Sequence, residues 1–276
     1  MSWDLERAYR EHLTTADLAV LAEVGGDRRL DAVLASPELD AVVFGENRAP
    51  EQLGTVSPFL TFAVAIHRTA ERLATATYVE EWIGPRQRLP VFAVQPLRDL
   101  LADPVRRYYL IELLSSYTHV VSGSTWQQTR RGWRRRRFSE LDPVHLVELL
   151  ESVAPTEVSG VLRRLGDLAL FLTGVFPDHT ANTTLGRASA EVRLLRSAGI
   201  EPEPSELGTV GPFELLERLG ARWYRLAVQR AVFPSANVQV LESIAEHFTH
   251  ARRILNVVTD TYLFPLRDLW FGRPAA

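Results

Sequence analysis

The stretch Leu165-Gly166-Asp167-Leu168-Ala169-Leu170-Phe171-Leu172-Thr173-Gly174-Val175-Phe176 decides the fold. As a helix it is apolar nearly all round, and such a helix belongs in the centre of a core. The periodic pattern extends it over about residues 156–176. A single carboxylate, Asp167, lies inside the run. It needs a partner there, because burying an unpaired charge is costly.

Three pairs of a capping residue and a proline mark further helix starts: Ser57-Pro58, Asp103-Pro104 and Asp142-Pro143. The cap accepts a backbone N–H, and proline lacks the N–H that would otherwise stay unpaired. Apolar residues at helical spacing follow each pair. Besides a helix after Asp142, the chain is therefore predicted to form helices near residues 4–23, 27–35, 38–44, 58–82, 104–119, 156–176, 187–198, 213–230 and 236–263. Residues 83–90, with their glycine and prolines, are predicted to form an irregular connection.

One segment departs from this helical pattern. Residues 120–129 are rich in β-formers, and residues 133–138 follow Arg131-Gly132. This pattern predicts a β-hairpin near residues 120–139 with its turn at Arg131-Gly132. A two-residue turn would place Trp126 and Trp133 on one face, whereas a three-residue loop would separate them. The predicted fold class is therefore mainly α, with a short inserted β-hairpin.

Composition indicates one folded body. The chain has 276 residues, of which 46% are hydrophobic and 24% charged, with a net charge of −3. We predict a single helical domain over residues 1–276, or two parts, 1–153 and 154–276, that share one core. The N-terminus lacks the pattern of a secretory signal, and the most apolar run, residues 168–176, is too short to span a bilayer. We therefore expect a cytoplasmic protein without a membrane segment.

The chain contains no lysine and no cysteine, so all 31 basic residues are arginine. This excludes Schiff-base chemistry, a Walker A phosphate loop, thiol nucleophiles, disulfides and cysteine-bound zinc. Nucleophile-elbow and dinucleotide-binding glycine motifs are also absent. We expect no cofactor, and the sequence leaves open whether the protein is an enzyme.

The predicted hairpin is a candidate for binding phosphate groups or nucleic acid. Guanidinium groups pair with phosphates, and indole rings stack on bases. In the alternative interpretation the hairpin is a solvated edge whose arginines pair with Glu140 and Asp142. The candidate residues are Trp126, Trp133, Arg134, Arg135, Arg136 and Arg137.

Asp167 is the second candidate. It would serve as a general base or a ligand in an internal pocket of an enzyme or sensor, lined also by Tyr224, His250 and Asn256. The alternative is a structural ion pair with an arginine of a neighbouring helix, which is the interpretation we favour.

The last predicted helix carries a polar stripe of Glu246, His250, Arg253, Asn256 and Asp260, because these residues repeat at helical spacing. His247 and His250 are weak candidates for metal ligands, joined by a carboxylate from elsewhere. The helix lacks the motif of zinc peptidases and that of di-iron bundles. The alternative, which is the commoner case for such a stripe, is a helix face exposed to solvent.

Several strings together resemble a group of bacterial, largely actinobacterial, proteins to which no activity is attached. They are Ser57-Pro58-Phe59-Leu60, residues 81–87, 133–143 and 166–179, and residues 251–265. The resemblance implies a single helical unit and supplies no catalytic residue. We therefore expect a regulatory or interaction protein with a protein partner, or one that forms a homodimer. The alternatives are nucleic-acid binding through Arg134–Arg137 and the enzyme or sensor with a pocket at Asp167.

Overall fold

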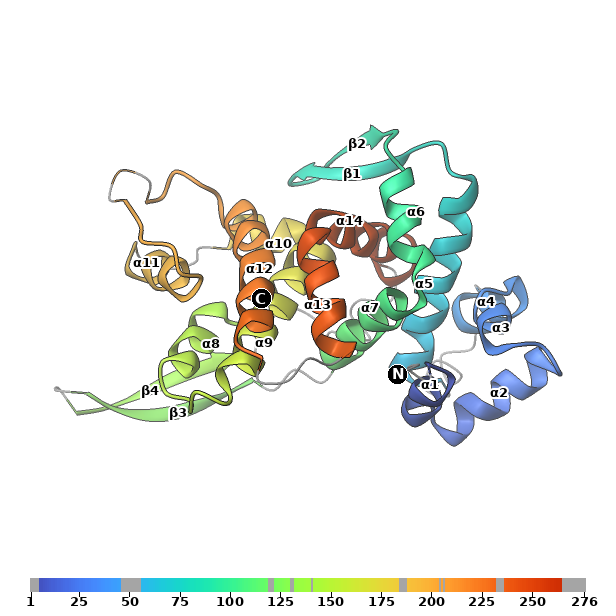
Figure 1. Ribbon diagram of the computed structural model, residues 1–276, viewed down its shortest axis with the longest axis horizontal. Helices are drawn as coiled ribbons and strands as arrows, with labels where there is room; N and C mark the ends of the chain where they lie inside the picture. The colour runs from blue at the N-terminus through green and yellow to red at the C-terminus, as the bar shows by residue number, and fades with distance from the viewer. Residues whose placement is uncertain are drawn as a thin grey trace. The chain divides into compact units, whose positions relative to one another are not determined.

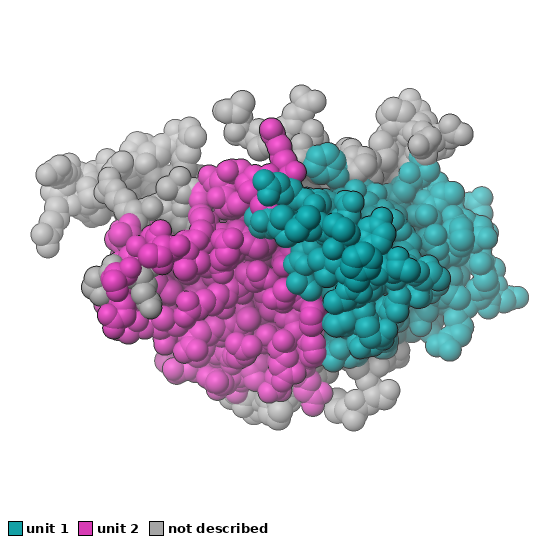
Figure 2. Space-filling model, turned by 90° about the horizontal axis from the view of Figure 1, so that it is seen from above, with its two compact units in different colours: residues 1–83, 87–118, 253–276 teal, residues 84–86, 119–252 magenta. Residues whose placement is uncertain are grey.

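The computed structural model describes residues 5–45, 56–118, 122–129, 132–139, 141–183, 188–203, 205, 207–231 and 236–264. Over these residues the chain is mainly helical, which confirms the predicted class. Its contacts gather into two compact units, shown in two colours in Figure 2. Unit 1 comprises residues 1–83, 87–118 and 253–276, and unit 2 comprises residues 84–86 and 119–252. The unit boundaries thus fall after residues 83, 86, 118 and 252. That residues 1–153 and 154–276 share one core stays a prediction.

Unit 1 is built around one long helix. Its helices are α1 (Leu5–His12), α2 (Thr15–Gly25), α3 (Leu30–Leu34), α4 (Pro37–Phe44), α5 (Pro58–Thr75), α6 (Gln95–Ala102) and α7 (Pro104–Ser116). Helix α5 begins at the predicted cap, where Ser57 Oγ accepts the N–H of Leu60 at 3.1 Å. Residues 59–67 of α5 are all buried, and α5 packs against α3, α4, α6 and α7 (Figure 1). This helix is therefore the centre of the unit.

The single helix predicted over residues 4–23 is wrong, because the chain breaks it into α1 and α2. Thr14 Oγ1 accepts the N–H of Asp17 at 3.1 Å, and Asp17 Oδ2 accepts the N–H of Thr14 at 2.8 Å. This reciprocal capping box starts a new helix. Asp17 is fully buried, and its Oδ1 also accepts the N–H of Ser57 at 2.8 Å. One carboxylate thus joins the start of α2 to the start of α5.

The irregular connection predicted over residues 83–90 is also wrong. Strands β1 (Val79–Gly84) and β2 (Gln87–Val91) pair into a two-stranded sheet, which we call the β1–β2 ribbon. Helix α5 accordingly ends at Thr75 rather than near residue 82. Val79, Trp82 and Ile83 are β-branched or aromatic residues that favour an extended backbone, and this preference prevails over the helical spacing.

Unit 2 is centred on a close pair of helices, α9 (Val158–Val175) and α12 (Pro212–Gln229). Residues 165–175 are all buried, which confirms the central role predicted for this stretch. Gly166 and Gly220 permit the close approach. A Cβ at Gly166 would lie 2.5 Å from the Tyr224 ring, and one at Gly220 would lie 2.8 Å from Ala169 Cβ. The other helices of the unit are α8 (Pro143–Leu150), α10 (Pro177–Asn182), α11 (Ala188–Ser197) and α13 (Ala236–Glu246).

The helix predicted over residues 236–263 is divided. After α13 come α14 (Phe248–Val258) and the π-helical turn η2 (Thr259–Leu263). His247 lies at the break, where its Nδ1 donates to the Ser243 carbonyl oxygen at 2.9 Å. The same carbonyl oxygen also accepts the backbone N–H of His247 at 3.2 Å. The boundary between the units falls inside α14, after Arg252.

Strands β3 (Ser122–Thr129) and β4 (Gly132–Ser139) form the predicted antiparallel hairpin. Thr129 pairs with Gly132, so Gly132 belongs to strand β4 and not to the turn predicted at Arg131-Gly132. The hairpin itself, near residues 120–139, is confirmed.

Candidate functional site

The side chains of residues 119–140 lie outside what the structure describes, so the hairpin candidates are placed by their backbone alone. In the ladder Trp126 pairs with Arg135, Gln127 with Arg134 and Gln128 with Trp133. Arg136 and Arg137 continue the same strand. Binding of nucleic acid by these residues stays a prediction.

Asp167 and Tyr224 do lie together. The Tyr224 hydroxyl donates to Asp167 Oδ1 at 2.9 Å, inside unit 2. Arg163 Nε lies 3.7 Å from Asp167 Oδ2. This arginine comes from the preceding turn of α9 itself; a partner from a neighbouring helix stays a prediction. Gly166, next to Asp167, leaves the space in which the Tyr224 ring lies against α9.

This arrangement satisfies the carboxylate on both oxygens, through a phenol on one and a guanidinium on the other. Of the other two residues proposed for the pocket, His250 belongs to unit 2 and Asn256 is buried in unit 1. The structure thus brings together Asp167 and Tyr224.

The proposed metal ligands, His247 and His250, have ring centroids 6.0 Å apart. Within the described part of the chain no group of three or more histidine, cysteine, aspartate or glutamate side chains has the arrangement of a metal site. His247 uses Nδ1 to bond the Ser243 carbonyl oxygen, as described above.

The polar stripe of the last helix has a structural role in unit 1. Arg253 Nε lies 2.7 Å from Glu81 Oε1 on β1. Asp260 accepts two hydrogen bonds from Arg88 of β2, at 3.0 and 3.3 Å. These two ion pairs attach the β1–β2 ribbon to the C-terminal part of α14 and to η2. The stripe was expected to be a solvated helix face. At Arg253 and Asp260 it instead holds the β1–β2 ribbon.

The β1–β2 ribbon and its flanks expose large apolar side chains that the sequence reasoning missed. Phe92 is 73% exposed, and Tyr78, Ile83 and Leu89 are about half exposed. The Tyr78 and Phe92 ring centroids lie 6.0 Å apart. Tyr78 precedes β1 and Phe92 follows β2, so the two residues lie at the end of the ribbon opposite its turn. We call Tyr78 and Phe92 the aromatic patch. The signal lay in the β-forming residues Val79, Trp82 and Ile83, whose segment the sequence analysis assigns to a helix end and a loop.

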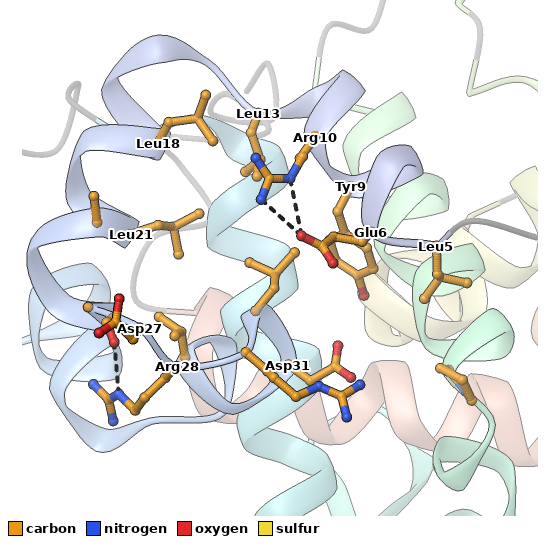
Figure 3. Close-up of a pocket in the computed structure, with 17 residues that line it drawn as sticks. Leu5, Glu6, Tyr9, Arg10, Leu13, Leu18, Leu21, Asp27, Arg28 and Asp31 are labelled. Carbon is orange, nitrogen blue, oxygen red and sulfur yellow. Dashed lines mark hydrogen bonds and ion pairs between the residues drawn. The ribbon is translucent and has the colours of Figure 1, made fainter.

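A second surface feature of unit 1 is a groove of about 750 Å³ between α1, α2 and α3 (Figure 3). Leucines of all three helices line it, and charged residues surround it. None of the candidate site residues named from the sequence lines this groove.

The floor of the groove includes the buried residue Tyr9, whose hydroxyl shares a 3.0 Å hydrogen bond with Nε2 of the buried His67. Burial raises the pKa of Tyr9 above its usual range. Burial, with the charge of Arg107 adding to it, lowers the pKa of His67 to about 3. Both side chains are therefore neutral at pH 7.

This histidine predicts a pH dependence of stability. Below pH 6.5 the unfolded chain binds a proton at His67 that the folded chain does not bind until about pH 3. Stability therefore falls as the pH falls through this window, by about 2 kcal/mol between pH 7 and pH 5. Denaturant titrations at both pH values should show a larger loss for wild type than for His67→Gln, which does not titrate. Equal losses in the two proteins would contradict the buried neutral histidine.

No helix among the described residues has the length and apolar character needed to cross a bilayer. The two surface features of unit 1, the aromatic patch and the groove, are the parts of the site geometry that sequence reasoning did not find. Neither a protein-family model, nor a curated protein, nor a solved structure matches this chain.

Proposed function

We propose that this chain is a non-catalytic interaction protein of the cytoplasm that pairs with a second copy of itself through the aromatic patch on the β1–β2 ribbon. The observation that carries the proposal is the exposure of Tyr78 and Phe92 side by side. Single exposed apolar residues are ordinary, whereas adjacent exposed aromatic rings are typical of interaction sites.

Two of the charged residues beside the patch are paired within unit 1, which favours a partner surface without strong charge. Arg88 is neutralised by Asp260, and Glu81 by Arg253. A strongly charged partner such as nucleic acid would find no complementary charge in these pairs. An apolar, neutral patch is complementary to itself, because aromatic rings pack well on aromatic rings and a two-fold axis brings identical patches together.

The amount of exposed apolar surface sets the expected strength. Tyr78, Ile83, Leu89 and Phe92 together offer on the order of 400 Å², whereas a standard interface buries about 800 Å² per partner. The patch would thus form the centre of a modest interface. We expect a dimer with a Kd in the micromolar range.

Phe92→Asp should weaken this dimer at least tenfold, because it places a charge at the centre of the apolar contact. Sedimentation equilibrium of the full chain from about 1 to 200 µM measures the Kd. Leu149→Asp on α8 is the matched control, since Leu149 is also a large exposed apolar residue, 43% exposed, but belongs to unit 2 and not to the ribbon. It should leave the Kd unchanged. A wild-type protein that stays monomeric over the whole range, or equal effects of the two variants, would overturn the proposal.

A further inference from the structure

The groove between α1, α2 and α3 is a second surface, and it is separate from the aromatic patch. Its apolar lining comes from three helices and the turn after α1. Figure 3 shows Leu13, Leu18 and Leu21 directed into the hollow. Leu18 on α2 is 42% exposed although it is a leucine in a helix that packs on α3 and α4. Leu5 of α1 and Leu30 and Val33 of α3 add to this apolar lining.

The size of the groove suits a helix. Three turns of α-helix are about 16 Å long and 10–12 Å wide with side chains, which is a cylinder of roughly 1,300–1,800 Å³. Half of such a cylinder matches the groove volume of about 750 Å³. By volume, the groove would therefore take the apolar half of such a helix and leave its other half in water.

The charges around the groove distinguish between kinds of ligand. Arg10 pairs with Glu6 at 2.9 Å, and Arg28 lies 3.6 Å from Glu38. The lining also contains Asp27, Arg29 and Asp31, whose side chains form no ion pair or hydrogen bond with any described part of the chain. An acyl chain favours an uncharged cavity, and nucleic acid favours a basic one. A rim with two unpaired carboxylates and one unpaired guanidinium is instead complementary to the charged flanks of an amphipathic helix.

From these observations we infer that the groove binds an amphipathic helix of a partner protein. Leucine-type residues spaced three and four apart contact the leucine lining. The flanks of the bound helix are mainly basic, opposite Asp27 and Asp31, with an acidic residue opposite Arg29. The binding is expected to be of moderate strength, because the groove is open and half of the helix stays in solvent.

The probe is a synthetic 18-residue peptide of leucine, lysine and glutamate, with leucines at helical spacing and lysines in excess. Fluorescence anisotropy with the full chain should give a Kd in the range of about 10–100 µM, which is typical of a small, half-open contact. Leu18→Glu should weaken binding at least tenfold. Val42→Glu is the matched control, because Val42 on α4 is 41% exposed and does not line the groove. It should change the Kd less than twofold.

Two further comparisons make the test specific. A peptide of the same composition with leucines at every second position should not bind, since it presents no helical stripe. Phe92→Asp should bind the peptide as wild type does, which separates this site from the proposed dimer surface. Absence of peptide binding at 1 mM, equal binding of the two peptides, or equal effects of Leu18→Glu and Val42→Glu would each overturn the inference. Circular dichroism confirms that both variants remain folded.

Discussion

Asp17→Ala is expected to lower the free energy of unfolding by about 3 kcal/mol. Asp17 is fully buried and accepts backbone N–H bonds from both Thr14 and Ser57. Removing the carboxylate leaves these two donors without their acceptor, and each such loss costs about 1–3 kcal/mol when the group is shielded from water. The loss also frees the start of α5, the central helix of unit 1.

Chemical denaturation measures the size of this effect, and hydrogen exchange with mass spectrometry locates it. Protection should fall in α2 and α5 and stay unchanged in α9 and α12. Asp31→Ala is the matched control, because Asp31 is an exposed acid in the first turn of α3 and should cost only about 0.5 kcal/mol through the helix dipole. A stability of Asp17→Ala within 0.5 kcal/mol of wild type would refute the role assigned to the capping box.

Asp167→Ala is expected to cost about 3 kcal/mol in unit 2. The change leaves the buried Tyr224 hydroxyl without its acceptor and Arg163 without its carboxylate. Removing one partner of a buried ion pair costs about 3–5 kcal/mol. The lower end applies here because Arg163 is partly exposed and can turn to water.

A double-mutant cycle tests whether the pair is structural. Tyr224→Phe alone should cost about 1.5 kcal/mol, and it should cost much less in the Asp167→Ala background, because the hydrogen bond is already lost. If Asp167 instead served a pocket of an enzyme or sensor, Asp167→Ala would leave stability within about 0.5 kcal/mol of wild type. Hydrogen exchange should then show no loss of protection in α9.

The sequence predicted the helices whose signals are local. Ser57, Asp103 and Asp142 cap the starts of α5, α7 and α8 as expected, because a cap acts within its own first turn. The buried stretch of residues 165–175 was equally predictable, since a helix that is apolar nearly all round must lie in a core. The two helices predicted to be continuous, over residues 4–23 and 236–263, are each interrupted near a single residue. Thr14 and His247 each end a helical pattern that hydrophobic spacing alone continues.

The candidate site was less predictable because it depends on contacts between distant segments. Asp167 and Tyr224 are 57 residues apart, and only the α9–α12 packing brings them together. Arg253 and Glu81 are 172 residues apart, so no local pattern indicates that the polar stripe of the last helix holds the β1–β2 ribbon. The aromatic patch was missed for the same reason, since exposure of Tyr78 and Phe92 depends on the ribbon that carries them.

The division of α14 after Arg252 has a consequence for folding during synthesis. Residues 119–252, the bulk of unit 2, form one continuous segment, which can complete its contacts as soon as it leaves the ribosome. Unit 1 contains the earliest residues made, yet its ribbon is held by Arg253 and Asp260. The β1–β2 ribbon, although translated early, can therefore form these two ion pairs only after residues 253–260 have been translated.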